Sequence, residues 1–122
     1  MGERILIVDD DLLLCNLLRM ALGRAGYQTV EAYSGDTALS YLADNDVDLI
    51  LLDVMMADIN GFDVLRKLKA DPELSQIPVV FLTARVDAIS QKTGLDIGAV
   101  EYLTKPITPE MLIERVQSVL GN

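Results

Sequence analysis

The sequence predicts a three-layer α/β domain, in which helices cover both faces of a parallel β-sheet. Continuous aliphatic runs without polar alternation recur along the chain, and such runs are typical of strands buried on both faces. Segments with helical spacing of apolar residues separate these runs, with short connections, which is the order expected of βαβ units. With 122 residues, of which 51% are hydrophobic and 24% charged, the chain has the size and composition of one globular domain. We therefore expect a single domain over residues 1–122.

Five segments are predicted to form the strands. Residues 4–8, 48–52 and 77–82 are dominated by aliphatic and β-branched side chains, so we place them in the buried centre of the sheet. Residues 28–33 and 100–103 are more polar, and we place them nearer the sheet edges.

The helix expected after residues 4–8 has an apolar stripe at helical spacing. Its members lie at i, i+3, i+4, i+7, i+8 and i+11: Leu14, Leu17, Leu18, Ala21, Leu22 and Ala25. Gly26 is the expected C-terminal cap, because glycine readily adopts the left-handed conformation that ends many helices. Cys15 lies among these leucines, so we expect a buried, unreactive thiol.

Four further helices are expected. Ser34 can cap the second, which extends to about residue 45, and the third covers residues 61–70. The fourth, over residues 86–97, has the least regular apolar pattern. The last has the strongest start signal, Thr108-Pro109-Glu110, which combines an N-cap, a proline at the first helical position and an acid in the first turn. Its inward stripe has four members: Leu112, Val116, Val119 and Leu120.

The charge and the missing residue types exclude several functions. Ten Lys and Arg against nineteen Asp and Glu give a net charge of −9, which disfavours direct binding to nucleic acid or an anionic membrane. No apolar run approaches the ~18 residues of a membrane span, and the first residues have no signal-peptide pattern. Because there is no His, a Ser-His-Asp catalytic set, a His-ligated metal and a self-made phosphohistidine are excluded on this chain. Any imidazole chemistry must come from a partner, and the single Cys suits the cytoplasm as the expected location.

Polar residues cluster where the predicted strands end. Asp9-Asp10-Asp11 follows the first strand, Asp53 the third, Thr83 the fourth and Thr104-Lys105-Pro106 the fifth. Because ligands of open α/β sheets bind at the carboxyl ends of the strands, we expect these side chains to converge. Crowded carboxylates repel one another and resist desolvation, so a hard divalent cation such as Mg²⁺ is expected to neutralise them. Acids, a hydroxyl and an amine together are typical of a phosphoryl-transfer site with a metal, a nucleophile and a clamp.

Each of these residues also has a purely structural interpretation. Asp11 is suited to cap the first helix, Asp9 could do the same, and Asp53 could cap a loop. Thr83 alone could be a satisfied strand-end hydroxyl, and Lys105 alone a solvated surface amine. The joint pattern favours a site, because several separate strand ends would each have to supply the right polar group by accident.

Taken together, these motifs resemble the receiver domains of two-component response regulators. The similarity extends from Ile5 to Leu120. It depends on six motifs: Ile-Leu-Ile-Val-Asp-Asp at residues 5–10, Asp-Leu-Ile-Leu-Leu-Asp at 48–53, Gly61, Thr83-Ala84, Gly98-Ala99 and Tyr-Leu-Thr-Lys-Pro at 102–106. The resemblance implies a flavodoxin-like fold, with five parallel strands in the order 2-1-3-4-5 and five helices.

The resemblance also implies the chemistry of the site. Asp53 would be the phosphoacceptor, taking a phosphoryl group from the phosphohistidine of a histidine kinase or a histidine phosphotransfer protein. Thr83 and Lys105 would contact the phosphoryl oxygens, and the bond from Lys105 to Pro106 is a candidate cis peptide that aims the lysine inward. Mg²⁺, or Mn²⁺ in its place, would be held by four groups: Asp10 directly, Asp9 mainly through water, Asp53, and the backbone carbonyl of Met55.

Further residues would set the signal if the resemblance holds. Movement of Thr83 toward the phosphoryl group would let Tyr102 turn inward, and the surface formed by the fourth helix, fifth strand and fifth helix would then bind a downstream protein or a fused output domain. Met55 and Arg85 stand where the family tunes loss of the phosphoryl group, and this pair of side chains predicts a long-lived phosphorylated state. Ala57 stands where the family often has proline, so we expect a less rigid metal-binding loop.

Three alternatives belong to other functional classes. A phosphorylation-independent pseudo-receiver would only bind a partner, but the polar positions of the site are all retained. An aspartyl-phosphate hydrolase resembling the haloacid dehalogenases would need a second Asp where Met55 stands, so turnover of external phosphoesters is not expected. A dinucleotide-binding domain would need G-x-G-x-x-G after the first strand, where this chain has acids. The expected function is therefore a phosphoacceptor signalling module and not an enzyme with an external substrate, and its oligomeric state stays open.

Overall fold

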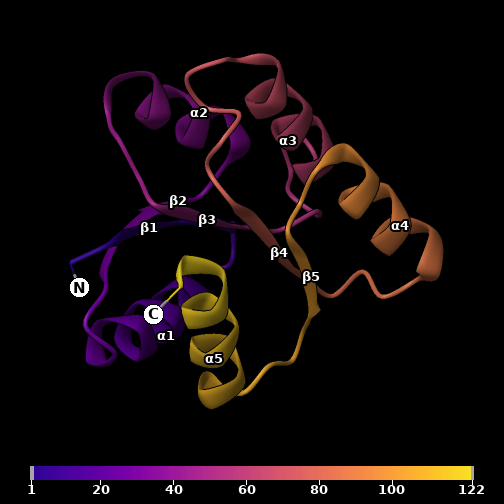
Figure 1. Ribbon diagram of the computed structural model, residues 1–122. Helices are drawn as coiled ribbons and strands as arrows, with labels where there is room; N and C mark the ends of the chain where they lie inside the picture. The colour runs from indigo at the N-terminus through magenta and orange to yellow at the C-terminus, as the bar shows by residue number, and fades with distance from the viewer. Residues whose placement is uncertain (1, 122) are drawn as a thin grey trace.

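Residues 2–121 are described by the computed structural model, and strands and helices alternate along them (Figure 1). The strands are β1 (Arg4–Val8), β2 (Gln28–Ala32), β3 (Leu49–Leu52), β4 (Val79–Thr83) and β5 (Glu101–Thr104). The helices are α1 (Leu12–Arg24), α2 (Gly35–Asp44), α3 (Gly61–Ala70), α4 (Ala88–Ile97) and α5 (Pro109–Leu120). Among these helices of residues 2–121, none is both long and apolar enough to cross a membrane.

The strands form one parallel sheet in the order β2-β1-β3-β4-β5. The predicted flavodoxin-like topology is thereby confirmed. Helices α1 and α5 cover one face, and α2, α3 and α4 cover the other, so the sheet is the middle of three layers (Figure 1). The edge strands β2 and β5 are only partly buried, as their more polar sequences predict.

Each central strand sends alternate side chains into two separate cores. In β1, Ile5 and Ile7 belong to the core shared with α1 and α5, whereas Leu6 and Val8 belong to the core beneath α2 and α3. All four side chains are at most 1% exposed. Because both faces of the strand are buried, its sequence is a continuous apolar run without alternation.

The predicted N-terminal caps of α2 and α5 are confirmed. Ser34 Oγ accepts a hydrogen bond from the Thr37 amide at the start of α2, and Thr108 Oγ1 accepts one from the Met111 amide at the start of α5. At the end of α1 the cap is Ala25 and not the predicted Gly26, which follows it with a φ of 97°, a backbone conformation that favours glycine. Local hydrogen bonding therefore determines where these helices begin and end.

Several boundaries differ from the prediction by one or two residues. Helix α4 begins at Ala88 rather than at residue 86, because the Asp87 carboxylate caps it through the Ser90 amide at 2.9 Å. Strands β4 and β5 extend one residue further than predicted, so Thr83 and Thr104 are their last residues.

Only part of the predicted apolar stripe of α1 is buried. Cys15, Leu18 and Leu22 pack in the core shared with α5. Leu17 is 55% exposed, so the prediction that it faces the core is wrong. Its flank of α1 borders an open groove toward α5, and the sheet beneath covers a narrower arc of the helix than the apolar stripe occupies.

Candidate functional site

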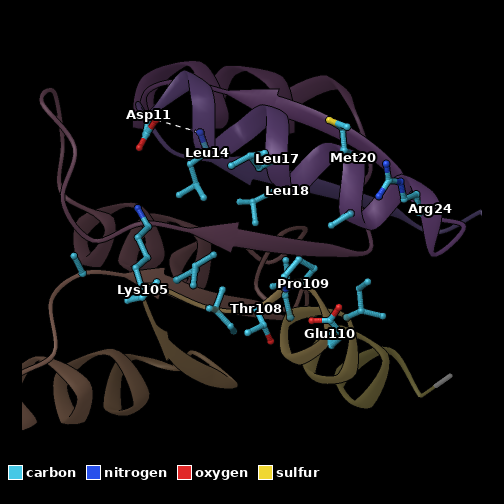
Figure 2. Close-up of a pocket in the computed structure, with 17 residues that line it drawn as sticks. Asp11, Leu14, Leu17, Leu18, Met20, Arg24, Lys105, Thr108, Pro109 and Glu110 are labelled. Carbon is cyan, nitrogen blue, oxygen red and sulfur yellow. Dashed lines mark hydrogen bonds between the residues drawn. The ribbon is translucent and has the colours of Figure 1, made fainter.

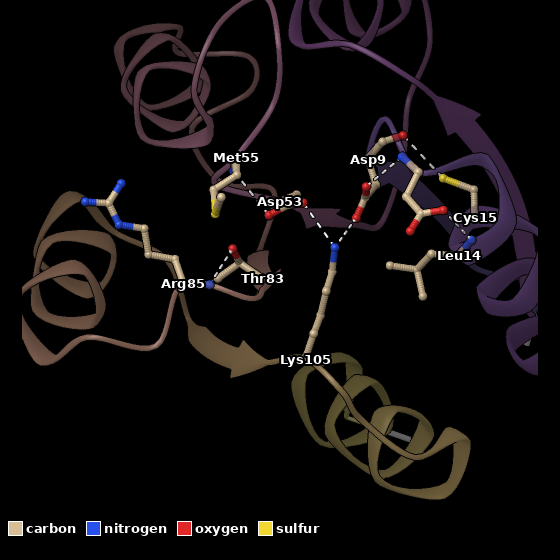
Figure 3. Close-up of polar contacts among 9 residues, drawn as sticks. Asp9, Leu14, Cys15, Asp53, Met55, Thr83, Arg85 and Lys105 are labelled. Carbon is tan, nitrogen blue, oxygen red and sulfur yellow. Dashed lines mark hydrogen bonds and ion pairs between the residues drawn. The ribbon is translucent and has the colours of Figure 1, made fainter.

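Three charged side chains meet at the carboxyl edge of the sheet. Asp9 follows β1, Asp53 follows β3, and Lys105 follows β5 and reaches over the end of β4. The Lys105 Nζ atom lies 2.8 Å from Asp9 Oδ2 and 3.1 Å from Asp53 Oδ2, so one ammonium bridges both carboxylates (Figure 3). The peptide bond from Lys105 to Pro106 is cis.

Burial and charge shift the ionisation of this cluster. Asp9 is 3% exposed and Asp53 is 6% exposed. Burial, with the neighbouring charge of Asp53, raises the pKa of Asp9 despite the opposing contact with Lys105. Burial alone would lower the pKa of Lys105, but its hydrogen bonds to Asp9 and Asp53 outweigh burial, and its pKa is raised. The ammonium therefore stays charged at neutral pH and compensates two carboxylates that would otherwise be costly to bury.

Asp9 is held through both its backbone and its side chain. Its Oδ1 atom accepts a hydrogen bond from the Asp11 amide at 2.9 Å, and its own amide donates to the Ala32 carbonyl at 3.1 Å. The Cys15 thiol donates to the Asp9 carbonyl at 3.4 Å. Burial, and secondarily the charge of Asp9, raises the pKa of Cys15 to about 12, which agrees with the prediction of an unreactive thiol. Asp11 caps α1 through the Leu14 amide at 3.1 Å, as its structural interpretation predicts.

Asp53 is presented by the loop that joins β3 to α3. Its Oδ1 atom accepts a hydrogen bond from the Met55 amide at 3.1 Å, and its amide donates to the Val8 carbonyl at 3.0 Å. Gly61 lies so close that an added Cβ would stand 2.2 Å from the Asp53 carbonyl oxygen. This close approach requires glycine, which gives the Gly61 motif a packing reason. The Met55 side chain itself is 55% exposed.

Thr83 and Tyr102 are connected through the backbone of Arg85. Thr83 is fully buried, and its Oγ1 atom accepts a hydrogen bond from the Arg85 amide at 3.2 Å. The Tyr102 hydroxyl donates to the Arg85 carbonyl at 2.6 Å, and its ring packs against Phe81 with 5.6 Å between centroids. The Arg85 guanidinium pairs with Asp87 at 3.4 Å on the exposed surface. One loop residue thus joins the hydroxyl at the end of β4 to the aromatic ring on β5.

The carboxylate and carbonyl oxygen atoms at the carboxyl edge of the sheet are the type of ligand that hard divalent cations prefer. Asp9 and Asp53 contribute buried carboxylates, Asp10 beside them is exposed, and the Met55 carbonyl lies in the same loop as Asp53. Across residues 2–121, no three His, Cys, Asp or Glu side chains form a ready-made metal cage. Mg²⁺ is usually bound by one or two carboxylates with water at its other positions, so this donor set fits it.

An apolar groove of about 860 Å³ opens beside the site, between α1 and α5 (Figure 2). Leu14 and Leu17 line its α1 side, and residues 105–110 with Ile113 line the opposite side. Asp11 and Lys105 lie at the end of the groove nearest the charged cluster. Exposed apolar surface of this kind is typical of interaction sites.

Comparison with known proteins identifies the family. Residues 5–117, nearly the whole chain, match the family described as the response regulator receiver domain. The chain belongs to this family. Receiver domains are signalling modules of two-component systems and not classical enzymes, so the resemblance inferred from the sequence motifs is confirmed.

Three similar proteins illustrate the match. The receiver domain is 39% identical over 119 residues to the phosphate regulon transcriptional regulatory protein PhoB of Pseudomonas aeruginosa, covering 98% of this chain and 52% of that protein. It is 41% identical over 120 residues to the DNA-binding response regulator MtrA of Mycobacterium tuberculosis, covering 98% and 51%. A crystal structure described as a response regulator from Chloroflexus aurantiacus has a TM-score of 0.94 at 33% identity, with 100% of both chains covered. The chain spans about half the length of the curated relatives it matches.

One residue of the β3–α3 loop has no distinguishing signal in the sequence. Asp58 accepts hydrogen bonds from the amides of Gly35 and Asp36 at the start of α2. Its partners lie 23 and 22 residues earlier in the chain, and an aspartate in a loop is too common to indicate such a contact. Only the tertiary structure reveals this link between the site loop and α2.

Proposed function

We propose that this receiver domain, taking residues 1–122 as one unit, is the phosphoacceptor of a cytoplasmic two-component phosphorelay. The observation that carries the proposal is the contact of the Lys105 ammonium with the buried carboxylates of Asp9 and Asp53. A mobile cation beside a buried acid can stabilise the additional negative charge that a phosphoryl group brings. Because the chain has no His, the phosphohistidine donor must belong to a partner, either a histidine kinase or a histidine phosphotransfer protein.

In the proposed reaction, a carboxylate oxygen of Asp53 attacks the phosphorus atom of the partner's phosphohistidine. The P–N bond breaks, its electron pair stays on the imidazole nitrogen, and the new P–O bond makes an acyl phosphate on Asp53. Lys105 then exchanges its contact with Asp53 Oδ2 for a phosphoryl oxygen, and the Thr83 hydroxyl donates to another. Both donors come from the ends of the neighbouring strands β4 and β5, so the sheet itself need not rearrange.

The carboxylates have separate proposed roles toward the metal. Mg²⁺, or Mn²⁺ in its place, would supply positive charge to the phosphoryl oxygens during transfer. Asp10, Asp53 and the Met55 carbonyl would bind the metal directly, and Asp9 would act mainly through water. The exposure of Asp10 supports its direct role.

The signal would pass from Asp53 to the surface formed by α4, β5 and α5. The Thr83 hydroxyl accepts from the Arg85 amide, so its movement toward a phosphoryl oxygen would release the loop that also holds the Tyr102 hydroxyl. Tyr102 would then move inward and change that surface, which would bind a downstream protein or an output domain. The net charge of −9 disfavours direct contact of this domain with nucleic acid.

Met55 and Arg85 are proposed to slow loss of the phosphoryl group. The exposed Met55 side chain lies at the mouth of the site, and Arg85 would swing from Asp87 toward the phosphoryl group to limit access of water. We expect the acyl phosphate of the Met55→Asn variant to hydrolyse faster than that of the native chain. Release of inorganic phosphate from each phosphorylated protein, in the presence of Mg²⁺, measures the two rates. Equal and rapid rates for both proteins would contradict the shielding role.

Incubation with acetyl phosphate and Mg²⁺, followed by intact-mass measurement, tests the central assignment. We expect the native chain to gain ~80 Da, the mass of one phosphoryl group, and Asp53→Asn to gain nothing. A gain in both proteins, or in neither, would contradict the role of Asp53. Failure to trap beryllofluoride with Mg²⁺ would favour a phosphorylation-independent pseudo-receiver, and sustained release of phosphate from external phosphoesters would favour a hydrolase.

A further inference from the structure

The β3–α3 loop is tied to the start of α2 by the carboxylate of Asp58. Its Oδ1 atom accepts a hydrogen bond from the Gly35 amide at 3.2 Å, and its Oδ2 atom accepts one from the Asp36 amide at 3.0 Å. The first amides of a helix have no acceptor within the helix, and a negative charge there is favoured by the helix dipole. Asp58 therefore makes two charge-assisted bonds to a segment more than twenty residues away in the chain.

Apolar packing reinforces the same contact. Gly35 is buried, and a Cβ added to it would stand 2.2 Å from Cγ2 of Ile59, the residue after Asp58. The Ile59 side chain thus lies directly on the backbone of α2, and any side chain larger than that of glycine at residue 35 would displace it. Ser34 already caps α2 by accepting a hydrogen bond from the Thr37 amide. The helix therefore does not need Asp58 as a cap, and the bonds to Asp58 serve to connect the loop to the helix.

Elsewhere in the loop, backbone hydrogen bonds lie near its two ends, and Met56 between them packs against the core beneath α2 and α3. The Met55 amide donates to Asp53 Oδ1 at 3.1 Å, and the Gly61 amide donates to the Val54 carbonyl at 2.8 Å. Ala57, in the middle of the loop, lacks the ring by which a proline would restrict the backbone. The contacts of Asp58 and Ile59 with α2 add a polar and an apolar restraint to this part of the loop.

We propose that Asp58 is a positioning residue that holds the β3–α3 loop against α2, so that the Met55 carbonyl is kept in the conformation that binds Mg²⁺. This inference rests on the proposed function, because it assumes that the Met55 carbonyl is a metal ligand. Preorganisation of this kind raises affinity because the ligand does not have to order the loop when it binds. The Asp36 amide bond, with smaller contributions from the Ile59 and Gly35 amides, lowers the pKa of Asp58, so the carboxylate is charged at neutral pH.

Mg²⁺ titration followed by backbone-amide NMR tests this role without relying on activity. We expect Asp58→Ala to raise the Mg²⁺ dissociation constant about threefold or more, below the ~10- to 100-fold typical of losing a group bonded directly to a metal ligand. Asp58→Asn, which keeps one acceptor oxygen, should lie between the native chain and Asp58→Ala. The matched control is Asp48→Ala, because Asp48 also accepts a backbone amide across segments, from Arg4 at 2.7 Å, but at the opposite edge of the sheet. The Mg²⁺ dissociation constant of the Asp48→Ala variant should equal that of the native chain.

The native chain offers a second measurement, which stays available if Asp58→Ala does not fold. By linkage, a contact that favours Mg²⁺ binding must itself be favoured by Mg²⁺. Saturating Mg²⁺ should therefore slow hydrogen exchange of the Gly35 and Asp36 amides relative to the amide of Arg4. Unchanged exchange at Gly35 and Asp36, or equal dissociation constants for Asp58→Ala and the native chain, would overturn the positioning role.

Failure of the proposed function would give a different result from failure of this inference. If the native chain shows no saturable Mg²⁺ shift at Asp53 and Met55, the metal site itself is absent, and both proposals are overturned. If the native chain binds Mg²⁺ and Asp58→Ala binds it equally well, only the role of Asp58 is overturned.

Discussion

At the scale of single residues, the site depends on one cation that serves two acids. Lys105 is 21% exposed at its side chain, whereas the side chains of Asp9 and Asp53 are only 5% and 7% exposed. Two carboxylates this close would repel each other and favour protonation without a counter-charge. The ammonium therefore compensates the negative charge of both acids at this edge of the sheet.

Replacing Lys105 should reveal this compensation as a loss of stability. We expect Lys105→Met to lower the free energy of unfolding at pH 7 without Mg²⁺ by about 1–3 kcal/mol, because two buried carboxylates lose their partner. Urea unfolding followed by circular dichroism measures the change. Lys92→Met is the matched control, since its ammonium pairs with Asp96 on the exposed face of α4 and should matter by less than about 0.5 kcal/mol. Equal losses in the two variants would contradict the interpretation.

The contribution of Lys105 should also depend on pH in the alkaline range. Its folded-state pKa is raised above the ordinary value of 10.5, so the folded chain holds the proton more tightly than the unfolded chain. The stabilisation is therefore fully present below about pH 10 and is lost as the pH rises through the raised pKa. The difference in unfolding free energy between the native chain and Lys105→Met should stay constant from neutral pH to about pH 9 and shrink above pH 10.5. If this difference in unfolding free energy instead grew as the pH rose, the raised pKa of Lys105 in the folded chain would be contradicted.

At the scale of elements, close packing places the loop that carries Asp53. Gly61 begins α3 directly against the backbone of Asp53 and Val54, while Asp58 and Gly35 join the same loop to α2. Helices α2 and α3 thus hold the site loop from one face of the sheet. Helix α1 is arranged differently, because its buried flank anchors it and its other flank leaves Leu17 exposed beside the groove.

Two Gly→Ala substitutions should distinguish the steric effect of close backbone packing on stability from the effect of helix propensity. Gly61→Ala places a Cβ 2.2 Å from the Asp53 carbonyl oxygen and 2.9 Å from Val54 Cα, so the backbone must shift. We expect a loss of about 1–3 kcal/mol in unfolding free energy, together with weaker Mg²⁺ binding. Gly23→Ala in α1 meets no atom within 4 Å and should instead gain about 0.5–1 kcal/mol from better helix propensity. Thermal unfolding of both variants checks this, and stabilisation by Gly61→Ala would contradict it.

At the scale of the whole molecule, the strand order turns distant segments into one site. Because β1 and β3 are neighbours and β5 lies one strand beyond β4, residues 52 and 96 positions apart come within hydrogen-bond distance. The sheet supplies the base of the site, and the loops and side chains at its carboxyl edge are the parts that we propose to move. A ligand that binds only this assembled edge should stabilise the entire fold.

Mg²⁺ should therefore raise the global stability of the chain. At a concentration about 100 times its dissociation constant, we expect about 2.7 kcal/mol of added unfolding free energy, which excess chelator should remove. Asp10→Asn should lose most of this gain, because it removes a proposed direct ligand. Asp46→Asn, in the exposed loop before β3, should retain all of it. A gain that is equal in both variants would show that Mg²⁺ acts elsewhere.

The sequence by itself determined the features that depend on short-range patterns. Strand and helix positions follow from apolar spacing, the starts of α2 and α5 follow from Ser34 and Thr108, and the polar residues of the site stand out because they close apolar runs. These signals act within a few residues and need no knowledge of the folded chain. Only the tertiary structure decided that Lys105 bridges Asp9 and Asp53, and that Asp58 binds α2. Those contacts depend on the strand order and on which helix lies beside which loop, because they join residues far apart in the chain.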